Sequence, residues 1–166
     1  RNSPPTERVL LTVLVTDIVG STEKAAAMGD LRWKDLLHAH DAIVRREMKS
    51  YGGQEINTTG DGFILAFTGP TRAIQCATAI SQELSRLGLV TRTGLHTGEC
   101  ERREDDLSGL AVHIASRISS NAPPNSILVS STVRDLVVGS GIRFSDQNVY
   151  SLKGVPGEWP LYAVLQ

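Results

Sequence analysis

Residues 54–68 read QEINTTGDGFILAFT, and this stretch decides the fold class. Both halves are rich in residues that favour β-strands, and Gly60 followed by Asp61 between them is a turn signal. The stretch therefore predicts a β-hairpin with Asp61 at or beside its turn. An acidic residue between two glycines raises the question of what its carboxylate holds.

A strand and a helix are expected before this hairpin. Residues 8–19, RVLLTVLVTDIV, are apolar on both faces, as in a strand at the centre of a covered sheet, and this strand ends at Asp17. From there to the YGG motif at residues 51–53, helical spacing of apolar residues predicts one helix, with Ser21 and Thr22 as its capping pair.

The chain after the hairpin completes the pattern. Helical spacing predicts a second helix, followed by a strand, a polar loop, a third helix that ends at a double proline, and another strand. A short helix and two or three strands should follow. The order predicts an α+β fold, a ferredoxin-like βαββαβ core with additional C-terminal strands and helices packed on a mainly antiparallel sheet. The predicted segments are the helix near 73–87, the strand 89–100, the loop 101–109, the helix 110–125 and the strand 126–131.

The composition suits one globular domain over residues 1–166, with its core at about 8–164. The chain begins without a methionine, so we expect a domain from a longer polypeptide. A net charge of −1 with scattered basic residues argues against a nucleic acid polymer or an anionic membrane as partner. Cys76 and Cys100 form no disulfide or zinc motif, and no apolar run is long enough to span a bilayer, which favours a cytoplasmic location.

Asp17 and Asp61 are the candidate metal ligands. If the hairpin lies beside the first strand, the two carboxylates converge, and convergent carboxylates suit Mg²⁺ or Mn²⁺. The IVGST stretch directly after Asp17 would supply backbone N–H groups at a helix N-terminus, where phosphate binds. The alternative is that Asp17 caps a helix and Asp61 only fills a turn.

Five motifs in order, VTDIVGST, NTTGDGFILAF, GLHTGE, DDLSGLAVHIASRI and LKGVPGEWPLYAV, resemble the catalytic domain of class III adenylate/guanylate cyclases, closest to its bacterial, actinobacterial-like branch. The resemblance implies a homodimer whose interface holds two composite sites, each converting a nucleoside triphosphate to the 3',5'-cyclic monophosphate and pyrophosphate. It also implies two Mg²⁺ or Mn²⁺ ions per site. Their ligands would be Asp17, Ile18 and Asp61, while Gly20, Ser21 and Thr22 would cover the phosphates.

The same resemblance assigns residues of the partner subunit. Asn57 stands where the family has an adenine-reading lysine, and its companion aspartate is Asp106. Because an amide can both donate and accept, we expect ATP as substrate with weaker discrimination against GTP. His113 replaces a ribose-orienting asparagine, Arg117 would neutralise charge on the reacting phosphate, and Lys153 would bind phosphate.

An adenylate cyclase is therefore the expected function. Two alternatives stay open, because Asn57 and His113 depart from the family pattern. One is a regulatory domain that binds nucleotide with little or no turnover, and the other is a guanylate cyclase with relaxed base selectivity. A diguanylate cyclase is disfavoured, since the sequence has no GGDEF-like hairpin.

Overall fold

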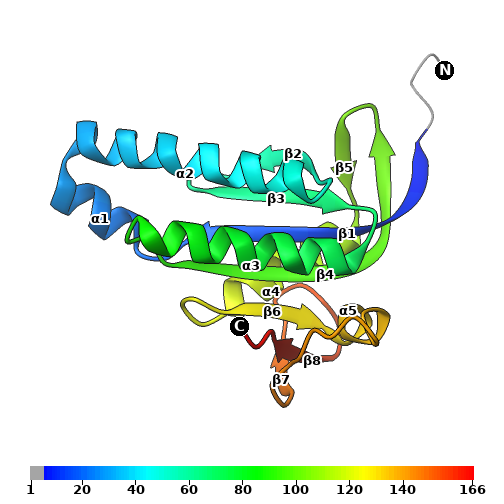
Figure 1. Cartoon of the computed structure of the whole chain (residues 1–166). Helices are drawn as coiled ribbons and strands as arrows, with labels where there is room; N and C mark the ends of the chain where they lie inside the picture. Colours follow the sequence, from blue (N-terminus) through cyan, green and yellow to red (C-terminus); the bar gives the residue numbers. More distant parts are fainter. Residues whose placement is uncertain (1–5) are drawn as a thin grey trace.

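A computed structural model describes residues 6–166, so the first five residues of the expected domain lie outside the described part. It confirms the predicted α+β class. One eight-stranded sheet has the strand order β2-β3-β1-β4-β6-β8-β7, with β5 paired to β4 (Figure 1). Every pairing is antiparallel except that of β4 with β6. The strands are β1 Glu7–Ile18, β2 Gln54–Thr58, β3 Gly62–Phe67, β4 Thr91–Arg103, β5 Asp106–Ser108, β6 Ile127–Ser130, β7 Asn148–Ser151 and β8 Glu158–Ala163.

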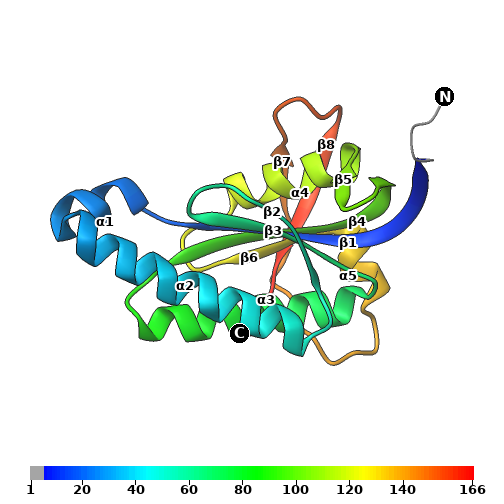
Figure 2. The same cartoon turned by 90° about the horizontal axis from the view of Figure 1, so that it is seen from above.

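Helices cover both faces of the sheet (Figure 2). On one face α2, α3 and α5 bury the main core, in which Val44, Ile74 and Val133 pack against Leu14 and Leu65. On the other face α4 packs against β1, β4 and the strands near the C-terminus. No helix in residues 6–166 is long and apolar enough to cross a membrane. The helices are α1 Ser21–Met28, α2 Asp30–Ser50, α3 Pro70–Arg86, α4 Leu110–Asn121 and α5 Ser131–Leu136.

The prediction of a single helix before the hairpin is wrong, because this segment of the chain forms two helices. Gly29, with φ 85° and ψ 159°, separates α1 from α2. The expected Ser21/Thr22 capping pair is wrong as well. Gly20 is the N-cap residue in a left-handed conformation (φ 68°), and no side chain among the described residues caps α1. The glycines allow a sharp change of direction that helical spacing alone does not reveal.

The prediction of a polar loop at 101–109 is also wrong. Strand β4 continues to Arg103, and β5 returns beside it, with Arg103 opposite Asp106 and Glu101 opposite Ser108. Most of these side chains face water, and an antiparallel ribbon tolerates a solvated face. A run of charged residues was therefore compatible with strand structure. Glu104 turns the ribbon with φ 57°.

Candidate active site

The predicted hairpin brings Asp61 beside Asp17. Strand β3 pairs with β1, and Asp17 lies opposite Gly62 in that register. The hairpin closes through the backbone N–H of Thr59, which donates to the carbonyl of Gly62 at 2.9 Å. Gly60 has φ 72°, a conformation that favours glycine at this loop position. One candidate metal ligand thus lies near the end of β1, and the other lies in the turn directly before β3, the strand that pairs with β1.

Gly62 allows this close approach. A Cβ atom at this position would lie 2.6 Å from the carbonyl oxygen of Thr16 and 2.6 Å from Oγ1 of Thr59. It would also lie 3.4 Å from Oδ1 of Asp17. Because one obstacle is backbone of the central strand, it cannot move aside at low cost. Any larger residue would push the hairpin, and Asp61 with it, away from Asp17.

The electrostatics of the pair suit a cation. Burial, and then contact with the Asp61 carboxyl, raise the pKa of Asp17 from 3.8 to about 6. The charge of Arg92 and the backbone N–H of Ile18 oppose that rise in pKa. Two carboxylates that repel each other present hard oxygen ligands, and a divalent cation would relieve the repulsion. The donor set thus fits Mg²⁺ or Mn²⁺.

Two carboxylates alone do not complete the coordination of such an ion. Within residues 6–166 no group of three or more His, Cys, Asp or Glu side chains is placed to hold a metal. The side chain of Ile18 is buried in the core, so only its backbone could contribute a ligand. The remaining ligands would have to come from that backbone, from water or from substrate phosphates.

Arg92 lies beside the candidate metal ligands, although the sequence did not indicate it. It lies opposite Asp17 in the pairing of β1 with β4, and its Nη2 is 3.9 Å from Oδ2 of Asp17. Its Nη1 donates to the carbonyl of Ser120 at 3.3 Å, while its Nε is buried and has no hydrogen-bond partner within residues 6–166. Only the register of two distant strands brings this guanidinium to the carboxylates, so no local pattern in the sequence indicated it.

The start of α1 leaves backbone N–H groups free beside these carboxylates. The N–H of Val19 is used, because it donates to the carbonyl of Val90 at 2.8 Å. With no side-chain cap on α1, the N–H groups of Gly20, Ser21 and Thr22 have no partner inside the helix. An open groove of about 510 Å³ adjoins this point; its lining is Ser21, Thr22, Ala25, Trp33, Leu37, Gly60 and Asp61.

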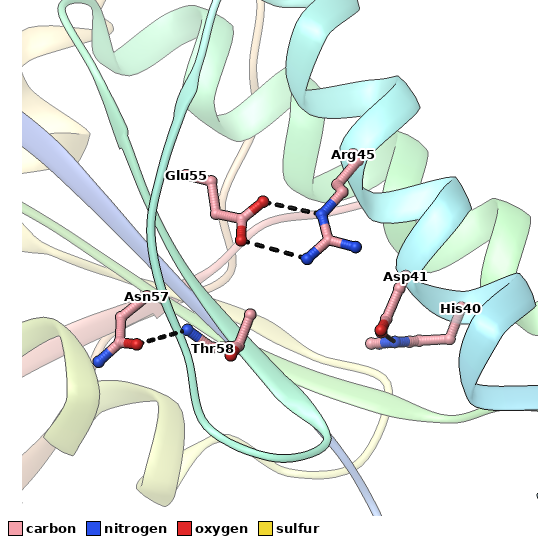
Figure 3. A network of polar contacts seen from close by, with 6 residues as sticks. All are labelled: His40, Asp41, Arg45, Glu55, Asn57 and Thr58. Carbon is pink, nitrogen blue, oxygen red and sulfur yellow. Dashed lines mark hydrogen bonds and ion pairs between the residues drawn. The ribbon is translucent and has the colours of Figure 1, made fainter. Parts of the chain in front are cut away.

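A β-bulge determines which face of the sheet Asn57 occupies. Glu55 lies opposite Leu65 and Asn57 lies opposite Ile64, so Ile56 is an extra residue between them. Glu55 points to α2, where its carboxylate accepts from Arg45 at 2.8 and 3.2 Å (Figure 3). Asn57 points to the other side of the strand in the same view. The bulge thus moves Asn57 to the face that α4 covers.

The side-chain amide of Asn57 has a defined orientation. The backbone N–H of Thr58 lies 2.8 Å from Oδ1 of Asn57 (Figure 3). A backbone N–H can only donate, so the atom that it contacts must be the amide oxygen. The Nδ2 group of this exposed side chain has no hydrogen-bond partner among residues 6–166, so it stays available as a donor. Asp106 is held in a similar way, since its Oδ1 accepts from the N–H of Leu107 at 3.0 Å.

The residues expected to act on the partner's site also come from the α4 side. His113 and Arg117 are one turn apart on α4, and both are half-buried. Nε of Arg117 is buried and has no hydrogen-bond partner in the part of the chain that the structure describes. Lys153 is exposed in the turn between β7 and β8, and Nε2 of His113 lies 3.3 Å from its carbonyl oxygen. Within residues 6–166 no ion pair joins Arg117 or Lys153 to Asp17 or Asp61.

His96 is buried near these elements but has a packing role. Its Nδ1 lies 2.8 Å from Oγ of Ser130, and its ring packs edge-on against Trp159 at 5.5 Å. Burial lowers its pKa to about 4, so the ring is neutral at physiological pH. His40, on α2, is fully buried, and its Nδ1 lies 2.8 Å from Oδ1 of Asp41 (Figure 3).

A model of one protein family, described as the adenylate and guanylate cyclase catalytic domain, matches residues 3–166. The chain belongs to this family. The resemblance inferred from five motifs is thereby confirmed, and the chain is a class III nucleotidyl cyclase domain.

Relatives of this cyclase domain are larger proteins. A relative from Rhizobium meliloti strain 1021 is 27% identical over 164 residues, which is 89% of this chain but 27% of that protein. The adenylate cyclase of Lachancea kluyveri is 30% identical over 161 residues, which is 78% of this chain and 8% of that protein. The cyclase domain therefore spans about a quarter or less of the length of these two relatives.

Solved structures confirm the fold of the cyclase domain. The adenylyl cyclase CyaB from P. aeruginosa superposes with a TM-score of 0.92 at 24% identity, covering 98% of this chain and 96% of that one. The catalytic core of a rhodopsin-guanylyl cyclase with converted specificity, in complex with ATPalphaS, gives 0.88 at 20% identity, with 97% and 98% covered. The guanylate cyclase domain from Catenaria anguillulae in complex with GTP gives 0.85 at 19% identity, with 96% and 98% covered.

Proposed function

We propose that this domain is an adenylate cyclase, which converts ATP to 3',5'-cyclic AMP and pyrophosphate at the interface of a homodimer. One observation carries the proposal. The carboxylates of Asp17 and Asp61 converge beside the uncapped N-terminus of α1, so a cation site adjoins an anion site. This is the arrangement that the phosphates of a metal-bound nucleotide require.

The reaction joins the ribose 3'-oxygen to the α-phosphorus. The bond from the α-phosphorus to the oxygen that bridges it to the β-phosphorus breaks, pyrophosphate leaves with that oxygen, and the 3'-hydroxyl releases its proton to solvent. Asp17, Asp61 and the backbone of Ile18 would hold two Mg²⁺ or Mn²⁺ ions, which supply Lewis-acid activation and neutralise phosphate charge. The chain itself would align the 3'-oxygen with the leaving group.

Several groups of the chain would bind the triphosphate. Ser21 and Thr22 line the groove beside Asp61, and the uncapped N–H groups of Gly20, Ser21 and Thr22 at the start of α1 would donate to phosphate oxygens. Arg92, beside Asp17, would add a positive charge from the same subunit. From the partner, Arg117 would stabilise charge on the reacting phosphate and Lys153 would bind the triphosphate.

Adenine as the base is supported by the orientation of Asn57. Because Oδ1 accepts from the backbone of Thr58, the amide offers Nδ2–H donors to the base. Adenine N1 is an acceptor, whereas guanine N1 carries a hydrogen and would meet a donor. The carboxylate of Asp106 can accept from the exocyclic amine of adenine. This fixed orientation favours ATP more strongly than a freely rotating amide would.

A site shared between two subunits is supported by Arg117, which lacks the contacts within its own subunit that such a site would supply. Arg117 has a buried Nε without a partner, and it forms no ion pair with Asp17 or Asp61 in residues 6–166. A second copy placed so that its α4 faces these carboxylates would pair the two halves. Two equivalent sites would follow from the two-fold symmetry of such a dimer.

The direct test measures cyclic nucleotide formation from ATP and from GTP, with Mn²⁺ or Mg²⁺, over a series of protein concentrations. We expect cyclic AMP, a specific rate that rises with concentration, and loss of activity in Asp61→Ala. Nucleotide binding without turnover, at concentrations where the dimer forms, would contradict the proposal. It would favour a regulatory domain instead.

A mixing experiment tests the composite site. Asp17→Ala and Arg117→Ala are each expected to be inactive, but an equimolar mixture should regain up to about a quarter of wild-type activity, because half of the dimers then hold one intact site of two. Mixing either variant with itself is the control. No recovery from a mixture of folded, dimeric variants would rule out sites shared between subunits.

Replacing the hydrogen-bond donor of Asn57 by an acceptor tests whether this residue recognises the base. Asn57→Asp keeps the shape of the side chain but replaces the Nδ2–H donors by an acceptor. We expect kcat/KM for ATP to fall by about tenfold or more and the ratio of GTP to ATP turnover to rise. An unchanged ratio would show that Asn57 does not contact the base.

A further inference from the structure

The turn that carries Lys153 has a defined geometry. The N–H of Val155 donates to the carbonyl of Leu152 at 3.0 Å, which closes a four-residue turn. Gly154 has φ 79°, while Lys153 is not among the residues with positive φ. A positive φ at the third position alone is typical of a type II turn. Lys153 and Gly154 thus share the central peptide of this turn.

Apolar contacts hold the two ends of the turn against α4. Leu152 and Val155 are buried, with 3% and 8% of their surface exposed, in a cluster with Ile114 and Ile118 of α4. Helix α4 and the hairpin of β7 and β8 extend on the same side of the sheet (Figure 2). These contacts fix where the turn lies, but they leave the orientation of its central peptide undetermined.

His113 contacts that central peptide directly. Its Nε2 lies 3.3 Å from the carbonyl oxygen of Lys153. A carbonyl oxygen only accepts, so Nε2 must carry the hydrogen. Type I and type II turns differ mainly in the direction of this carbonyl. A donor on α4 that binds the carbonyl therefore stabilises one of the two orientations.

Gly154 provides the room for this contact. A Cβ atom at position 154 would lie 3.1 Å from Nε2 of His113, which is tighter than ordinary van der Waals contact. The positive φ also favours glycine there. The close approach and the turn type thus depend on the same residue. Both place the backbone of Lys153 on the face of α4 that presents Arg117 one turn further along.

We propose that His113 is a positioning residue, which holds the Lys153 turn so that Lys153 and Arg117 act on the same triphosphate. This inference rests on the proposed cyclase function. It differs from the role implied by the family pattern, in which an asparagine at this position orients the ribose. In this chain the imidazole Nε2 is already engaged with its own subunit, and its effect on the reaction passes through Lys153.

Three substitutions of His113 separate these roles. Gln can place an amide N–H at a reach similar to that of His Nε2, whereas the side chain of Asn is one bond shorter and cannot. We therefore expect His113→Gln to keep kcat/KM for ATP within about threefold of wild type, and His113→Asn and His113→Ala to lose about tenfold, the effect of one positioning hydrogen bond. An Asn variant as active as wild type, with an impaired Gln variant, would overturn the proposal in favour of ribose contact.

A double-mutant cycle tests whether the effect passes through Lys153. Lys153→Ala should lower kcat/KM by about 100-fold, as expected for a lost charge contact to the transition state. Adding His113→Ala should then cost less than about twofold more, because the lysine that it positions is gone. A double variant that loses the full product of both effects would show that His113 acts on the substrate independently.

A spectroscopic measurement tests the contact without relying on activity. In ¹⁵N-histidine-labelled protein, the Nε2–H proton of His113 should be protected from exchange and visible, while that of exposed His38 should not be. The signal should vanish in His113→Asn and shift in Gly154→Ala. If it is absent from the wild-type protein, the contact is refuted. If it is present in a protein that makes no cyclic nucleotide, the cyclase proposal fails while the contact stands.

Discussion

Replacing Asp61 by asparagine should stabilise the metal-free domain although it destroys the proposed metal site. In the folded chain, burial and the neighbouring Asp61 carboxyl raise the pKa of Asp17 from 3.8 to about 6. A rise of that size corresponds to about 3 kcal/mol of unfavourable free energy at neutral pH. Burial is the larger cause, and 34% of the Asp17 side chain is exposed, so solvent screening reduces the share of Asp61 to about 1 kcal/mol.

The gain in stability from Asp61→Asn should depend on pH. Because the folded-state pKa of Asp17 is raised, the folded protein binds more protons than the unfolded chain between about pH 4 and pH 6. The free energy of unfolding therefore falls as the pH rises through that window. The substitution Asp61→Asn should remove part of this loss of stability. The variant protein should therefore be more stable than wild type at pH 7.5. At pH 4.5 Asp17 is protonated in both folded proteins, and the difference should nearly vanish.

Urea denaturation in EDTA at the two pH values measures the effect. The matched control is Asp35→Asn, because Asp35 is an exposed acidic residue on α2. This substitution should change the free energy of unfolding by less than about 0.5 kcal/mol. Excess Mn²⁺ should stabilise the wild-type protein more than Asp61→Asn, which reverses the order. A variant no more stable than wild type in EDTA at pH 7.5, or a gain that persists at pH 4.5, would refute the reasoning.

Two further substitutions test the supports of the site. Gly62→Ala should destabilise the domain by about 3 kcal/mol or more, because the new Cβ would lie 2.6 Å from the carbonyl oxygen of Thr16. The control is Gly69→Ala, which should cost about 0.5 kcal/mol, because no atom of the described residues lies within 4 Å of a Cβ at that position. Equal losses in urea denaturation would contradict this. Burial lowers the pKa of His96 to about 4, so the unfolded chain binds more protons between about pH 4 and pH 6.5, and this group destabilises the fold as the pH falls. The stability advantage of wild type over His96→Asn should therefore narrow between pH 7 and pH 4.5, and a constant advantage would show that His96 is not responsible.

Local features of the sequence determined most of the elements. The hairpin around Gly60 and Asp61 and the start of the helix at Leu110 follow from residue preferences within a few positions along the chain, although α4 ends at Asn121, four residues before the predicted end at 125. The five motifs identified the family, which the family match confirmed. Errors occurred where local signals were ambiguous. Helical spacing continued across Gly29, and the charged run at 101–109 had a polarity that suits either a loop or a solvated strand.

The assembly of the site depended on contacts between residues far apart in the chain. The register of β1 with β3 and β4 places Asp17 opposite Gly62 and Arg92, and the extra residue in β2 moves Asn57 to the face covered by α4. Strand preferences do not specify register or bulges, because these are set by the packing of both sheet faces. By itself the sequence identified the family and predicted which residues would carry the chemistry. Only the tertiary structure decided which groups meet, because hydrogen bonds, burial and pKa shifts arise from neighbours that the chain brings together on folding.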